Sequence, residues 1–269
     1  MLQSARFVLR HDNSGTLCDH KYALAVSGND VYAGGGFTTA GGSPATNIAK
    51  WNGSSWSPLG SGVRGGVGAL AVSGTDLYAG GEFTSPGNRI AKWNGTSWSA
   101  LGSGMSGGSS FPSVSALAVS GSELYAGGAF TNAGGSQANY IAKWDGNSWS
   151  PLGSGMNQFG YVSALAVLGS HLYAGGSFTT AGGKASPYLA KARIGSAAES
   201  ITASGTSATI QFSCVVGYDY HVQRTDSLVP PMTWTTLTTS PITPADDGSL
   251  TFTDTTAPAG TAYYRLVQH

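Results

Sequence analysis

Short apolar runs, separated by turn residues, follow one another along the first two thirds of the chain. The first four of these runs span residues 22–27, 30–37, 47–51 and 55–59. Each run has the length of a β-strand, and its Val, Ile, Tyr and Trp content suits a half-buried sheet. Asn52-Gly53, between the last two runs, is a strong signal for a tight hairpin turn. No stretch from residue 20 onward keeps a 3.6-residue apolar period. The pattern therefore predicts an all-β chain.

The same arrangement of four runs occurs four times. An Ala-Leu-Ala-Val segment opens each repeat, and its leucines, Leu24, Leu70, Leu117 and Leu165, lie 46, 47 and 48 residues apart. Self-similarity at this period indicates stacked supersecondary units, none of which can bury its apolar face alone. Four antiparallel strands in a unit of this length are typical of a propeller blade.

Glycine and tryptophan recur at fixed places within the repeats. A Gly-Gly doublet closes the second run and a Trp ends the third and begins the fourth, as in Gly34-Gly35, Trp51 and Trp56, then Gly80-Gly81, Trp93 and Trp98, then Gly127-Gly128, Trp144 and Trp149. This set resembles the Kelch blade over residues 22–194. The resemblance implies a propeller, and the regular recurrence of the Trp side chains favours a place in the core between blades.

The fourth repeat departs from this pattern. It keeps Gly175-Gly176 but has Ala192 where Trp is expected, and no fourth run follows. The segment Phe7-Val8-Leu9 precedes Ala23 by about the interval that separates Trp149 from the fourth repeat. We expect this segment to close the ring as the outer strand of the last blade, which gives a small four-bladed propeller over residues 1–194. A fragment of a larger ring and an open arc that pairs with a second copy are the alternatives.

A second domain is expected over residues 198–269, where the sequence motifs of the repeats no longer occur. Residues 191–197 are expected to form a linker, and alternating runs at 207–216, 218–225, 234–238, 249–254 and 262–267 predict a small β-sandwich. This region resembles the fibronectin type III or immunoglobulin-like modules of secreted bacterial proteins.

Charge and composition narrow the class of partner. Thirteen Lys and Arg balance thirteen Asp and Glu, and charged residues make up 10% of the chain, which argues against nucleic acid as a partner. No apolar run approaches the roughly 20 residues of a membrane-spanning helix, and residues 1–10 have no apolar signal core. We expect a secreted, extracellular protein whose signal peptide is not part of this sequence. Cys18 and Cys214 can form a disulfide only if the chain ends meet; two separate thiols are the alternative.

Most polar positions are explained by structure rather than by chemistry. The acids Asp30, Asp76 and Glu123 occupy one repeated hairpin position and are ascribed to the turn, with His171 in their place in the fourth repeat. The lysines Lys50, Lys92, Lys143 and Lys191 also recur at one position. We expect each lysine to lay its alkyl stem over a neighbouring Trp; the alternative is a ring of cations that receives an anionic ligand.

One local cluster could carry chemistry. His11, Asp12, Cys18, Asp19 and His20 lie within ten residues, and such side chains can bind a metal or supply a base with its orienting carboxylate. A polar loop is the other interpretation, and common catalytic motifs are absent from the chain. We expect no cofactor and no metal. The enzyme hypothesis, a hydrolase or metal-dependent lyase, therefore rests on His11, Asp12, Asp19 and His20 alone.

The repeats diverge most in two sets of loops, those between their second and third runs and those between successive repeats. Strand order places both sets on one face of a propeller, where aromatic and amide side chains suit a glycan or an extracellular protein. The candidate ligand-binding residues on these loops are Arg64, Arg89, Phe111, Tyr140, Gln158, Phe159, Tyr161 and Tyr188. We therefore expect a binding or adhesion protein, either monomeric or part of a longer secreted chain. The alternatives are the enzyme above and a structural piece of a longer surface protein.

Overall fold

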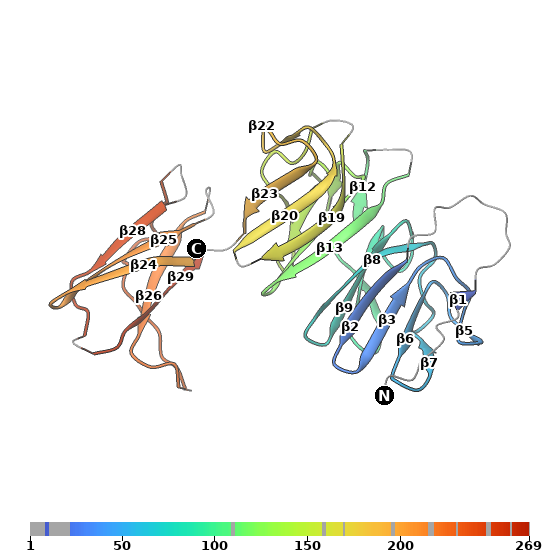
Figure 1. The fold of residues 1–269 in the computed structure, drawn as a ribbon, viewed down its shortest axis with the longest axis horizontal. Coiled ribbons are helices and arrows are strands. Elements are labelled where there is room, and N and C mark those ends of the chain that lie inside the picture. The colour runs from blue at the N-terminus through green and yellow to red at the C-terminus, as the bar shows by residue number, and fades with distance from the viewer. Residues whose placement is uncertain are drawn as a thin grey trace. The chain divides into compact units, whose positions relative to one another are not determined.

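The fold is taken from a computed structural model, which describes residues 9–10, 22–108, 111–157, 160–168, 170–194, 197–214, 218–229, 231–245, 249–258 and 260–268. Every regular element in these ranges is a β-strand, which confirms the all-β prediction (Figure 1). The described residues contain no helix of the length and apolarity needed to cross a membrane. The chain divides into an N-terminal part, Met1–Val167 with Tyr173–Ala190, and a C-terminal part, Leu168–Leu172 with Lys191–His269.

Each of the first three repeats forms a four-stranded antiparallel sheet whose spatial order follows the sequence. The first sheet contains β2 (Ala23–Ser27), β3 (Asp30–Gly34), β6 (Ile48–Trp51) and β7 (Trp56–Pro58). The second contains β8 (Val67–Ser73), β9 (Asp76–Gly81), β10 (Ile90–Trp93) and β11 (Trp98–Ala100). The third contains β13 (Val114–Ser120), β14 (Glu123–Gly128), β17 (Ile141–Trp144) and β18 (Trp149–Pro151). The fourth repeat has three strands, β19 (Tyr161–Leu168), β20 (His171–Ser177) and β23 (Leu189–Arg193).

A small hairpin lies between the second and third strands in three of the repeats. These hairpins pair β4 (Thr39–Ala40) with β5 (Ser43–Pro44), β15 (Asn132–Ala133) with β16 (Ser136–Gln137), and β21 (Thr180–Ala181) with β22 (Lys184–Ala185). A Gly-Gly turn closes each one, and in the third repeat Gly134 and Gly135 both have positive φ, 61° and 89°. The sequence patterns had predicted no strands in this connection.

The N-terminal segment joins the first repeat. Within β1 (Leu9–Arg10), Leu9 pairs with Ala40 of the first repeat's hairpin. The segments before the third and fourth repeats do the same, because Met105 in β12 (Met105–Ser106) pairs with Ala133 and Met156 bridges Ala181. The prediction that Leu9 completes the last blade is therefore wrong, and the described strands include no sheet that links the first and fourth repeats. Phe7 and Val8 lie outside the described residues.

Successive repeats pack through one glycine of the Gly-Gly doublet. A Cβ built on Gly34, Gly80 or Gly127 would lie 2.4 Å from Cγ1 of Val67, Val114 or Val162 in the next repeat. This distance is far below the 3.5–4.0 Å of a normal carbon contact. Only glycine lets each β-hairpin approach the next so closely, and Figure 1 shows the resulting sheets side by side in chain order.

Tryptophan makes the second contact between repeats. Trp98 Nε1 donates a hydrogen bond of 2.9 Å to the carbonyl of Leu59 in the preceding repeat, and Trp149 Nε1 donates one of 2.9 Å to Leu101. Both rings also pack against the cores between repeats, so the core interpretation is confirmed for these two side chains.

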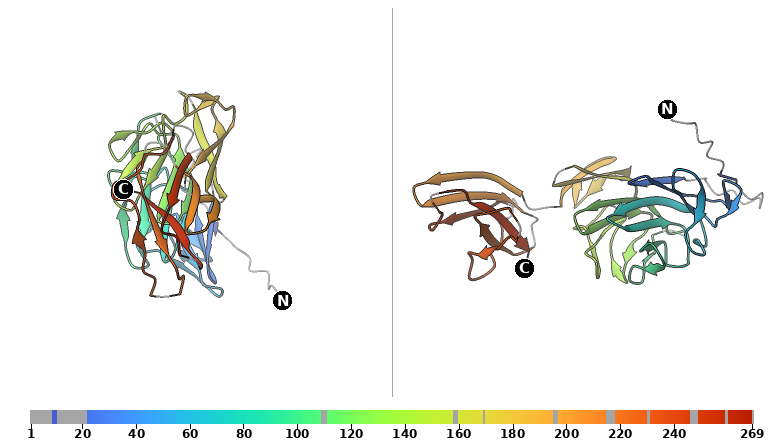
Figure 2. Two further views of the ribbon diagram at one scale, coloured as in Figure 1. Left: turned by 90° about the vertical axis from the view of Figure 1, so that its left-hand side faces the viewer. Right: turned by 90° about the horizontal axis from the view of Figure 1, so that it is seen from below.

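The C-terminal part contains two three-stranded antiparallel sheets, visible as two layers in Figure 2. One sheet contains β24 (Ala197–Ser204), β25 (Ser207–Ser213) and β28 (Ser249–Asp254), and the other β27 (Thr235–Thr236), β26 (Tyr220–Thr225) and β29 (Tyr263–Gln268). Ile210 and Phe212 of the first sheet share a buried core with Val222 of the second. The expected linker over residues 191–197 is instead strand at both ends, because β23 continues to Arg193 and β24, which was not predicted, begins at Ala197. Cys214 is buried, and Cys18 lies outside the described residues.

Candidate functional site

One backbone position, directly before the third strand of each repeat, has an uncommon conformation. Its occupants, Asn47, Arg89, Tyr140 and Tyr188, have φ angles of 62°, 68°, 67° and 65°. Positive φ is rare for residues other than glycine, and it costs on the order of 1–3 kcal/mol for bulky side chains. Two hydrogen bonds hold it in the third repeat, from Tyr140 N to Phe130 O (2.8 Å) and from Gly128 N to Tyr140 O (3.0 Å). Equivalent hydrogen bonds occur in the other repeats. The backbone therefore holds the Cα of this residue at the same place in every repeat.

In the first two repeats this side chain binds the protein itself. Asn47 Nδ2 donates to the carbonyl of Val63 (2.9 Å), and Arg89 Nε donates to the carbonyl of Pro112 (2.7 Å). Both carbonyls belong to segments that lead into a following repeat. Arg89 also donates to Oδ1 of Asn88 (3.0 Å). The structure therefore gives Arg89, predicted as a ligand contact, a role in fixing the loops.

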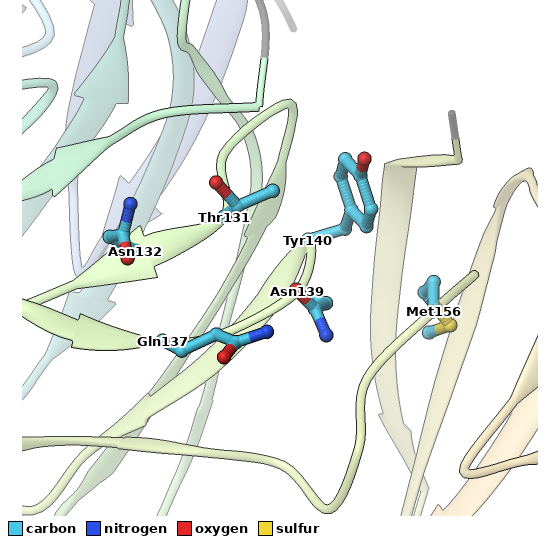
Figure 3. A pocket seen from close by; sticks show the side chains of 6 residues that line it. All are labelled: Thr131, Asn132, Gln137, Asn139, Tyr140 and Met156. Atoms are coloured by element: carbon cyan, nitrogen blue, oxygen red, sulfur yellow. The ribbon is translucent and has the colours of Figure 1, made fainter. Parts of the chain in front are cut away.

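The third repeat has a pocket at this position, with a volume of about 470 Å³. Its lining consists of Thr131, Asn132, Gln137, Asn139, Tyr140 and Met156 (Figure 3). The volume lies in the usual range of about 300–1,000 Å³ for small-molecule sites. Tyr140 is only 5% exposed, so its ring belongs to the wall of the site rather than to the open surface.

Amide groups give this pocket its polar character. Asn139 Nδ2 donates to the carbonyl of Ser154 (3.0 Å), which fixes the orientation of its side chain. Among the described residues, the side chains of Asn132 and Gln137 form no hydrogen bond with the protein. A carboxamide can both donate and accept, so these two groups are available to a polar ligand.

The second repeat keeps one of the pocket's amides, because Asn88 stands at the position of Asn139 and donates to the carbonyl of Ser103 (3.5 Å). The first and fourth repeats lack this amide and that of Gln137. The position of Gln137 is Pro44 in the first repeat and Ala185 in the fourth, and that of Asn139 is Thr46 and Pro187. In the second repeat this connection is four residues shorter. The combination of Asn132, Gln137 and Asn139 thus occurs only in the third repeat.

The other predicted contacts that the structure describes do not line this pocket. Phe111 is 80% exposed, Tyr188 and Tyr161 are exposed aromatics, and Arg64 is an exposed cation. Gln158 and Phe159 lie outside the described residues, as do all members of the His11–His20 cluster. Of the six predicted contacts that the structure describes, only Tyr140 lines the pocket. The concentration of amides in residues 131–139 is the sequence signal that would have found the others.

The repeated acids and lysines form ion pairs. Lys50 lies 2.9 Å from Asp30, Lys92 3.1 Å from Asp76 and Lys143 2.7 Å from Glu123, each pair bridging neighbouring strands. The hydrogen bond from Lys50 to Asp30 raises the pKa of the lysine, although partial burial acts against this. Turn chemistry alone therefore does not explain the acids, and these three ammonium groups are not assembled to receive an anion.

The fourth repeat has no such ion pair at these positions, because His171 stands in place of the acid, near the positive side chains of Lys191 and Arg193. Partial loss of solvent lowers the pKa of His171, and the positive charges of Lys191 and Arg193 lower it further. Within the described part of the chain, no three His, Cys, Asp or Glu side chains are grouped so as to hold a metal.

A buried charged cluster belongs to the C-terminal part. Asp254 is 3% exposed; it accepts hydrogen bonds from Arg224 Nη1 (2.5 Å), from the Tyr264 hydroxyl (2.9 Å) and from the Thr256 backbone N (2.9 Å). Burial alone would raise the pKa of Asp254, but the hydrogen bonds from Thr256 and Arg224 outweigh it and lower the pKa. These partners belong to different strands and turns, so the hydrogen bonds of Asp254 hold these elements of the C-terminal part together.

No protein-family model matches the chain, and no curated protein matches it at significant similarity.

Proposed function

We propose that the protein is a secreted binding protein that holds a neutral glycan in the pocket of the third repeat. In this proposal each repeat is a Kelch-like propeller blade, and the C-terminal part is a fibronectin type III or immunoglobulin-like module. The ordered four-stranded sheets and the Gly doublets that set their spacing support the blade assignment. The observation that carries the binding proposal is the pair of unengaged carboxamides beside a buried tyrosine.

The chemistry of the lining favours a neutral polar ligand. The pocket has amide and hydroxyl groups from Thr131, Asn132, Gln137 and Asn139, and apolar surface from Tyr140 and Met156, but no charged side chain. A sugar ring presents hydroxyl groups at its edge and C–H groups on its faces, so carboxamides can bind the edge while an aromatic ring covers a face. An anionic ligand would find no cation in this lining.

The same lining favours binding over turnover. The six lining residues include no carboxylate, imidazole or thiol, the groups that most often transfer protons or attack substrates in enzymes. The proposal therefore prefers a binding module to the hydrolase or lyase hypothesis.

A panel of neutral oligosaccharides, screened first on an array and then titrated calorimetrically, tests this proposal. Loss of one hydrogen bond costs about 0.5–1.5 kcal/mol, so Asn132→Ala or Gln137→Ala should weaken binding roughly 2- to 12-fold. Thr180→Ala, at the position of Asn132 in the fourth repeat, is the matched control and should leave the affinity unchanged. Absence of binding across the panel, or binding that neither pocket variant weakens, would overturn the proposal.

A further inference from the structure

Each inner repeat buries two different faces. We call the side that meets the preceding repeat the rear face and the side that meets the following repeat the front face. At the first junction, Ile48 on the front of the first repeat shares a core with Leu70 and Leu77 on the rear of the second. At the second junction, Ile90 on the front of the second repeat shares a core with Leu117 and Leu124 on the rear of the third. The same positions therefore form both junctions.

The front face of the fourth repeat is uncovered. Leu189 occupies the position of Ile48, Ile90 and Ile141, which are exposed by 0%, 0% and 2%. Leu189 itself is 62% exposed. Its neighbour Tyr188 is also exposed, so the front face of the last repeat presents two apolar side chains to solvent, and the position of Leu189 is buried in every other repeat.

The rear face of the first repeat is uncovered as well. Leu24 and Val26 are 69% and 66% exposed, whereas the equivalent Leu70 and Val72 pack against the core of the first junction. The two end faces do not cover each other within one chain, since both are exposed and no sheet connects the first and fourth repeats in the described residues.

The two uncovered faces carry the leucine and the glycine of the junctions inside the chain, with Lys21 at the position of the junction valine. At the inner junctions, Cδ1 of Leu70, Leu117 or Leu165 lies 3.5, 3.5 or 3.3 Å from the Cβ position of a glycine in the preceding repeat. Gly175 is the equivalent glycine of the fourth repeat, and a Cβ built there finds its nearest atoms only at 3.9 Å. The space at Gly175 is thus open for the leucine that the first repeat exposes.

We propose that the front face of the fourth repeat packs on the rear face of the first repeat of a second copy of this chain, with Leu24 seated over Gly175. Because the two faces differ, the contact is heterologous and two copies can make it twice, closing a ring of eight repeats. Eight blades lie within the usual four to eight of a propeller.

Light scattering coupled to size exclusion tests this arrangement in the full chain. The expected species is a dimer, with twice the 27.2 kDa mass of one chain. Leu24→Glu and Leu189→Glu should each give a monomer, and an unchanged far-ultraviolet circular dichroism spectrum would show that the fold is retained, because both side chains are exposed in the single chain. Leu228→Glu, at an exposed leucine of the C-terminal part, is the control and should remain dimeric.

Mixing the two monomeric variants provides the decisive measurement. Each variant keeps one intact face, so an equimolar mixture should form a one-to-one dimer through a single junction. A wild-type chain that stays monomeric, a dimer that survives both substitutions, or a mixture that stays monomeric would overturn the proposal. A wild-type series that grows with concentration would support the junction and overturn closure into a ring.

Discussion

Substitution of Gly80 with alanine should loosen the junction between the second and third repeats. The added Cβ would lie 2.4 Å from Cγ1 and 3.0 Å from Cβ of Val114. A normal carbon contact needs about 3.5–4.0 Å, so the two sheets would have to separate by roughly 1 Å. Such overpacking costs about 1–3 kcal/mol.

One effect acts in the opposite direction. Alanine restricts the unfolded chain more than glycine does, which stabilises a compatible site by about 0.4–1 kcal/mol. The net loss at Gly80 is therefore at most about 2.6 kcal/mol and centres near about 1.3 kcal/mol, or about 3–5 °C in Tm for a domain of this size. Gly175→Ala provides the matched control, because the nearest atoms to its added Cβ lie at 3.9 Å; this variant should keep or slightly raise the stability.

Denaturant unfolding in a Leu189→Glu background, in which the proposed association does not contribute, measures both variants. Val114→Ala introduced together with Gly80→Ala should recover part of the loss, giving a favourable coupling energy in a double-mutant cycle. Equal effects of Gly80→Ala and Gly175→Ala, or a cycle without coupling, would refute the close approach as the reason for the glycine.

Two further predictions concern charge. Because folding lowers the pKa of His171, the unfolded chain binds the proton more readily than the folded chain does. The free energy of unfolding should therefore decrease as the pH falls through about 6.5. His171→Asp should reduce this decrease, as measured by denaturant midpoints between about pH 7.5 and 5.5. An unchanged pH profile in that variant would contradict the assignment. The lowered pKa of Asp254 contributes stability that is present above its ordinary value of 3.8 and is lost on acidification below it. Asp254→Asn should cost about 1.5–3 kcal/mol at pH 7, since it leaves Arg224 without its charged partner, whereas the exposed control Asp226→Asn should have little effect.

The strands of the repeats were predictable because each repeat must present the same two faces to its neighbours. The strands β8, β9 and β10 fall where the apolar runs and the Gly doublet indicate them. The hairpin of β15 and β16 was missed, because two-residue strands carry no apolar alternation. Its position depends on backbone hydrogen bonds, such as the one from Thr131 N to Ser106 O, that join segments distant in sequence.

The site was predictable only in part, for the same reason. Loop divergence indicated Tyr140, but its burial follows from a left-handed backbone held by Phe130, ten residues earlier. The ion pair of Lys50 and Asp30 could have been inferred from strand register, because the antiparallel pairing places Lys50 opposite Tyr32, two residues from Asp30. The interaction of Arg89 with Pro112 had no comparable signal, since it crosses from one repeat to the loop before the next.

The contact between a glycine and the valine of the next repeat also governs how such a chain can change in length. Every junction uses the same pair, so excision of residues 67–113 would bring Gly34 opposite Val114, the same types of residue that meet at each existing junction. Duplication of that stretch would create one more identical junction. Duplication or deletion of whole repeats in the gene therefore keeps the contact between glycine and valine at every junction. Insertion of one residue within a strand would instead move the following side chains to the opposite face of the sheet.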